Sequence, residues 1–117
     1  MEKLVDAIRE VRNDSAANPF YGAPCVVFIS ADVESSMADL DADAAIENMI
    51  ITAASLGIDS CFMVGPLSLF DHNDADAFKK ELQFPEGYRP VCALILGYHA
   101  DGYTVESTRD LTKVAYI

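Results

Sequence analysis

Residues 53–66 read AASLGIDSCFMVGP, in which a short apolar run lies between Gly57 and the pair Gly65–Pro66. Glycine and proline are the residues that most often end helices and strands. Small apolar residues that lead up to a glycine are typical of a helix end, because glycine readily adopts the left-handed conformation at the C′ position. The apolar run over residues 58–64 then predicts a buried strand. The Gly65–Pro66 pair has two interpretations: it ends the strand, or it presents backbone at the strand end to a ligand.

Three helices are predicted around this stretch. Residues 1–13 carry apolar side chains at helical spacing, and residues 72–83 form a second amphipathic pattern, with Asn73 or Asp74 as its N-cap. Residues 40–56 are apolar almost all round, which indicates a central helix or one that packs on a partner subunit. Before them, Ser36 and Asp39 have the spacing of a capping box.

Two further strands are predicted from continuous apolar runs over residues 23–31 and 91–98. Such runs are typical of strands that are covered on both faces. Strands that alternate with helices predict an α+β fold, with a sheet sandwiched between helices. We expect a single domain over residues 1–117, in which residues 99–117 form a C-terminal tail.

Charge and composition exclude some classes of partner. The 117 residues are 51% hydrophobic, with 8 basic and 19 acidic residues and a net charge of -11. This balance argues against binding to nucleic acid or to an anionic membrane surface, since both need clustered Lys and Arg. No apolar run is long enough for a membrane span, and the N-terminus has no signal-peptide pattern, so we expect neither.

The three cysteines, Cys25, Cys61 and Cys92, are far apart in sequence, and each lies in an apolar stretch. We interpret them as buried, reduced thiols, which predicts a cytoplasmic location. His72 and His99 are distant in sequence from every cysteine, so we predict no metal site.

Three longer stretches carry further motifs in series: FYGAPCVVFIS (20–30), DADAAIENMIITAASLGIDSCF (41–62) and ELQFPEGYRPVCALILGYHADG (81–102). In order and spacing they resemble the Ala-Pro strand, the Glu-Asn/Ala-Ala/Leu-Gly helix and strand, and the Pro-Glu-Gly-Tyr/Leu-Gly-Tyr segment of the nitroreductase family. The resemblance covers roughly the C-terminal two thirds of the family pattern. It implies a nitroreductase-like mixed sheet flanked by helices.

The resemblance also implies a cofactor site for FMN. The backbone N–H groups of Val64 and Gly65 would face the edge of the flavin ring, and Arg109 would reach the flavin phosphate, with Lys113 as a weaker candidate. Asp43 and His99 depart from the family pattern, which has glycine and proline at those positions. The family's N-terminal Arg-Ser-Xaa-Arg motif for the flavin phosphate has no counterpart, so the sequence resembles a member shortened at its N-terminus.

Two functions follow as hypotheses. The first is an FMN-dependent oxidoreductase that transfers electrons from NAD(P)H to a nitroaromatic, quinone or similar acceptor, as a homodimer. The alternative is a flavin-poor, non-catalytic remnant that acts as a dimeric binding or interaction module. Because FMN brings negative charge to an already acidic chain that retains few basic groups, we expect weak FMN binding and little reductase activity in the 117-residue chain.

Overall fold

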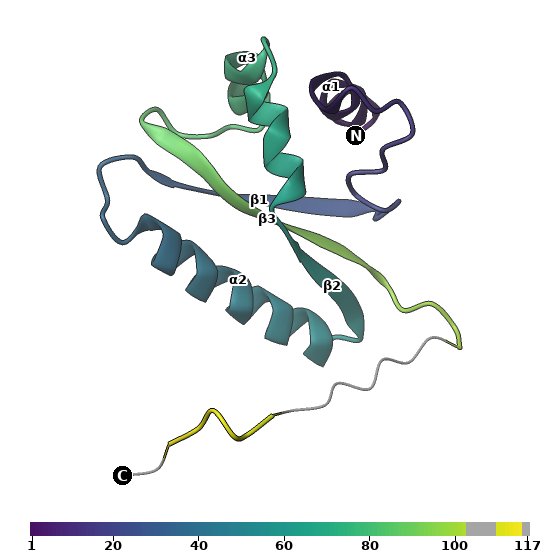
Figure 1. Cartoon of the computed structure of the whole chain (residues 1–117), viewed down its shortest axis with the longest axis vertical. Coiled ribbons are helices and arrows are strands. Elements are labelled where there is room, and N and C mark those ends of the chain that lie inside the picture. Colours follow the sequence, from purple (N-terminus) through teal and green to yellow (C-terminus); the bar gives the residue numbers. More distant parts are fainter. Residues whose placement is uncertain (103–109, 116–117) are drawn as a thin grey trace.

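The structure, a computed structural model, describes residues 1–102 and 110–115. Three α-helices, one 3-10 helix and three strands follow one another along this part of the chain (Figure 1). Their bounds are α1 Glu2–Arg12, β1 Cys25–Asp32, α2 Ala38–Ser55, β2 Ile58–Met63, η1 Gly65–Asp71, α3 Ala75–Glu81 and β3 Tyr88–Tyr98.

The three strands form one sheet in the order β1-β3-β2, and both strand pairs are antiparallel. In Figure 1, α2 covers one face of the sheet, whereas α1, η1 and α3 lie over the other. The α+β sandwich predicted from the sequence is therefore confirmed. The expected mixed pairing is not seen among the described strands, since β1 and β2 run in the same direction but are separated by β3.

Side chains from β3 fill the core on both faces of the sheet. On one face, Cys92 and Leu94 pack with Ala42 and Ile46 of α2. On the other, Ile95 joins a cluster supplied mainly by the N-terminal helix, the loop after it, η1 and α3: Ala7, Ile8, Phe20, Leu69 and Phe78. The central strand β3 therefore packs against helices on both faces of the sheet.

Both edge strands are more exposed than the sequence predicted. Residues Cys92 to Ile95 of β3 are buried, but β1 has no fully buried residue, and Cys61 and Phe62 of β2 are exposed. The prediction that all three strands are covered on both faces was wrong for β1 and β2. An apolar run shows that a segment is apolar, but not whether it lies at the edge of its sheet.

The helix ends are partly as predicted. Gly57 follows α2 with φ 71°, in the left-handed conformation expected at its C-terminus. The capping box does not form, because α2 has Met37 as its N-cap, with no side-chain cap hydrogen bond. Asp74 does precede α3 as its N-cap, but its side chain makes no cap bond; its own N–H donates to Nδ1 of His72 at 3.0 Å.

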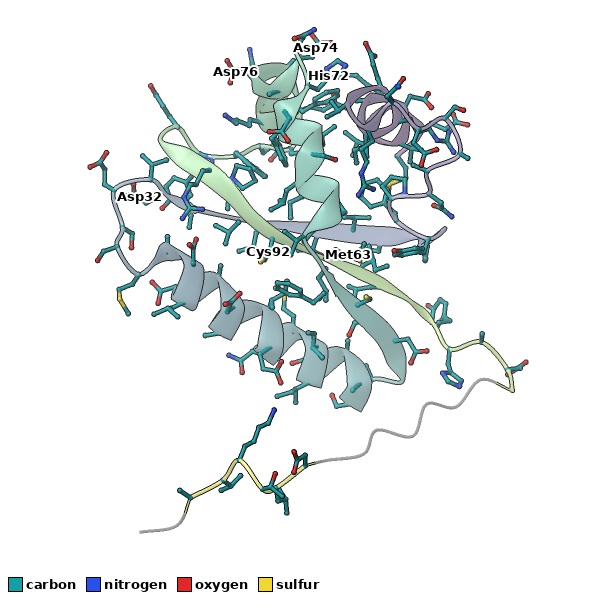
Figure 2. The ribbon with its side chains drawn as sticks, in the orientation of Figure 1. Asp32, Met63, His72, Asp74, Asp76 and Cys92 are labelled. Atoms are coloured by element: carbon teal, nitrogen blue, oxygen red, sulfur yellow. The ribbon has the colours of Figure 1, made fainter. Side chains whose placement is uncertain are left out.

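All three cysteines are free, but only one is buried. Cys25 and Cys61 are exposed because they lie on the two edge strands, which corrects the prediction of three buried thiols. Cys92 lies on β3 and packs against α2 (Figure 2). Burial, with added repulsion from Asp43 and Asp39, raises the pKa of the Cys92 thiol.

This difference predicts selective labelling. In the folded protein, an alkylating reagent at mildly alkaline pH should modify Cys25 and Cys61 and leave Cys92 unmodified. Cys92 is shielded from the reagent and, with its raised pKa, forms less of the reactive thiolate. Intact-mass spectrometry in buffer and then in denaturant measures the two stages. Equal labelling of all three thiols in buffer would contradict the burial of Cys92.

Candidate functional site

The segment Met63–Val64–Gly65 forms the junction between β2 and η1, and Figure 2 labels Met63 at this strand end. Pro66 stands in the first turn of η1, where its fixed φ suits a helix and its lack of an N–H costs nothing. Leu67 N–H donates to the Val64 carbonyl at 2.9 Å, and Ser68 Oγ–H donates to the Gly65 carbonyl at 3.0 Å. These local bonds fix the turn that follows the strand.

The backbone N–H groups of Val64 and Gly65 remain open at this junction. Neither donates a hydrogen bond to a residue in the described part of the chain, as is usual for the first N–H groups of a helix. Val64 is 57% exposed, so the junction lies at the surface. We call this segment, Val64 with Gly65, the 64–65 loop; it can donate two hydrogen bonds to a ligand.

Gly65 has no evident structural need to be glycine. A Cβ built on Gly65 would lie 3.7 Å from Nη2 of Arg12, which is ordinary contact, and its φ lies outside the left-handed region. A small residue here therefore leaves room above the loop without relieving strain. The ligand interpretation of Gly65–Pro66 stays a prediction beside the simple strand end.

Arg12, the last residue of α1, was not singled out by sequence reasoning. It follows the fully buried Ile8 by four residues and so points along nearly the same side of the helix. That spacing was the available signal, since it directs Arg12 toward the elements that bury α1. The structure brings its guanidinium beside Gly65.

Arg109 lies outside the described residues, so its position relative to the 64–65 loop is not described. Lys113 is exposed in the tail. Asp41 and Glu47 are exposed on α2. His99, one of the departures from the family pattern, places Nδ1 2.8 Å from Oδ2 of Asp59 at the end of the sheet.

Two hollows lie beside α2, away from the 64–65 loop. One, of about 350 Å³, is formed by the end of β1 and the first half of α2 and includes Asp32 and Asp41. The other, of about 320 Å³, is an apolar groove that includes Asn48 and Leu96. The structure thus does not bring the carboxylate of Asp41 together with the 64–65 loop.

Within residues 1–102 and 110–115, no group of three or more His, Cys, Asp or Glu side chains is placed to hold a metal ion. Across the same residues, none of the helices has the length and hydropathy needed to cross a bilayer.

Asp110, in the tail, has a lowered pKa because Thr112 donates side-chain and backbone hydrogen bonds to it.

Comparison with solved structures finds nitroreductases. A nitroreductase with bound FMN from Bacteroides fragilis NCTC 9343 is 28% identical, with a TM-score of 0.83, over 99% of this chain and 67% of that one. An FMN-dependent nitroreductase from Clostridium difficile R20291 is 26% identical, with a TM-score of 0.74, over 99% of this chain and 70% of that one. A nitroreductase from Desulfitobacterium hafniense DCB-2 is 24% identical, with a TM-score of 0.83, over 100% and 71% respectively, and supports the fold.

No curated protein matches the chain. A family-level match covers most of it, from residue 2 to residue 98, and so includes every helix and strand described above. Together with the helices packed on both faces of the antiparallel sheet, this match identifies the chain as a member of the nitroreductase family.

Proposed function

We propose that the chain is an FMN-dependent oxidoreductase of the nitroreductase type, which transfers electrons from NAD(P)H to a nitroaromatic, quinone or similar acceptor. The observation that carries the proposal is the exposed 64–65 loop, with two backbone N–H groups that have no acceptor among the described residues. Solved relatives at 26–28% identity that contain or depend on FMN support it.

FMN, when bound, would supply the two-electron chemistry between NAD(P)H and the acceptor. The chain's residues would bind and orient it. Val64 and Gly65 would donate their N–H groups toward the edge of the flavin ring, and Arg109 would bind the phosphate, with Lys113 as a weaker candidate. Donors fixed in the backbone suit this task, because they need no reorganisation when charge develops on the ring.

Substitution of Gly65 tests the loop. Gly65→Ala should weaken FMN binding by roughly tenfold or more, since a methyl group forced into a close backbone–ligand contact costs about 1–3 kcal/mol. Gly97→Ala is the matched control, because its Cβ would likewise meet only ordinary contact, 3.5 Å from Pro24. Flavin-fluorescence titration measures affinity, and thermal melting verifies the fold. Equal FMN affinity in both variants and the parent would rule out the ligand role of Gly65.

We also propose that the chain forms a homodimer through α2. The helix buries Ala38, Ala42, Ile46 and Ala53 against the sheet, while Leu40 and Ile51 are 62% and 59% exposed. These two residues are eleven apart, or three turns, and so lie on the same outer side of the helix. Exposed apolar side chains aligned along a helix are typical of a protein–protein contact.

A second candidate function, a non-catalytic dimeric interaction module, is favoured by the net charge of -11, which opposes FMN. Retained dimerisation without saturable FMN binding would select it.

We further propose a single domain with residues 99–117 as its tail. A cytoplasmic location is proposed on the strength of the three free thiols.

A further inference from the structure

The packing of α1 brings Arg12 near the 64–65 loop. Ala7 and Ile8 of α1 are buried in the same cluster as Leu69 of η1, so α1 packs against η1. From there Nη2 of Arg12 comes within 3.7 Å of the position that a Cβ of Gly65 would take. A ligand that docks on the 64–65 loop therefore docks beside this guanidinium.

Arg12 also differs from the other described arginines in its charge partners. Arg9 lies within ion-pair distance of Asp6, and Arg89 within ion-pair distance of Asp39. The lysines Lys3 and Lys79 pair with Glu81 and Asp76. Among the described residues, Arg12 has no carboxylate within 4.0 Å, although the chain holds 19 acidic and 8 basic residues. Its positive charge is thus left available at the loop.

We propose that the positive charge of Arg12 stabilises negative charge on a flavin ring docked at the 64–65 loop, and so raises the reduction potential of bound FMN. The proposal rests on the proposed function. Hydride transfer would break a C–H bond of NAD(P)H and form an N–H bond on the flavin, leaving the nicotinamide oxidised. The flavin would gain two electrons and one proton, and so one further negative charge at the loop. The positive charge of Arg12, an exposed side chain at the end of α1, would favour that charged state electrostatically.

The test compares oxidised and dithionite-reduced FMN. Arg12→Gln should weaken the binding of reduced FMN about tenfold more than that of oxidised FMN, which lowers the potential of the bound two-electron couple by about 30 mV. Arg12→Lys should retain most of the effect, because it keeps the positive charge. Lys80→Gln is the control, since Lys80 is exposed on α3 and the substitution changes the net charge equally. Dissociation constants for both redox states and a spectroelectrochemical titration give the readouts.

Riboflavin, which lacks the phosphate, separates two positions for the Arg12 charge. We expect Arg12→Gln to change riboflavin and FMN binding alike, because the charge acts on the ring. A loss confined to FMN would place Arg12 at the phosphate and overturn the inference. An unchanged ratio of the two redox states, or an equal change in Lys80→Gln, would also overturn it while leaving the proposed function intact. If the parent chain binds neither flavin, both proposals are rejected.

Discussion

Ile51→Glu is expected to convert the proposed dimer into monomers, with a dimer dissociation constant raised by roughly a hundredfold or more. Full burial of an isoleucine side chain contributes about 1.5–3 kcal/mol. In a two-fold symmetric dimer both subunits carry the substitution, so that loss occurs twice. Each loss of about 1.4 kcal/mol raises the dimer dissociation constant about tenfold. The two introduced carboxylates would also have to be desolvated. Sedimentation velocity over a concentration series measures the effect.

The fold of the monomer should tolerate this change, because Ile51 is 59% exposed and points away from the sheet. Val33→Glu provides the matched control: Val33 is 52% exposed and lies in the loop before α2, outside the helix. It should leave the dimer unchanged. A parent chain that sediments as a monomer at micromolar concentration, or an Ile51→Glu variant that remains dimeric, would contradict an interface on α2.

Leu94→Ala is expected to lower the free energy of unfolding by about 2–5 kcal/mol, a large share of the stability of a domain of this size. Leu94 has no exposed surface. It lies opposite Val27 of β1 and Phe62 of β2 in the sheet register. Its side chain packs with Ala42 and Ile46 beneath α2. Truncation therefore leaves a cavity where strand and helix meet.

Urea unfolding followed by circular dichroism measures this loss. Leu111→Ala is the control, since Leu111 is 67% exposed in the tail and should change the stability by less than about 0.5 kcal/mol. A loss below about 1 kcal/mol in Leu94→Ala would be incompatible with the tight packing of β3 between two helical layers.

The order of the helices and strands could be predicted because each is encoded locally. The spacing of Leu4 and Ile8 has the period of a helix, and Gly57 ends α2 with the left-handed φ that favours glycine. The long apolar run at residues 91–98 correctly predicted the buried strand, since β3 is the central strand of the sheet. Local pattern and tertiary burial agree at these positions.

Features that depend on neighbours in space could not be predicted in this way. Exposure of Cys61 follows from the place of β2 at the sheet edge, which pairing with β3 determines. The 3-10 helix η1 is only 7 residues long and begins with Gly-Pro, so the sequence shows no helical period there. The spacing from Ile8 indicates which side of α1 carries Arg12, but its place beside Gly65 depends on the docking of α1 on η1.

Titration of the purified 117-residue chain with FMN tests the flavin site most directly, with the visible absorption spectrum recorded before and after addition. We expect a nearly colourless preparation and then saturable binding with a dissociation constant above about 1 µM. The net charge of -11 opposes the phosphate, and of the described arginines only Arg12 lacks a carboxylate within ion-pair distance. Absence of saturable binding would contradict the flavin site itself. A yellow preparation that holds FMN at submicromolar affinity would contradict our assignment of the residues that bind it.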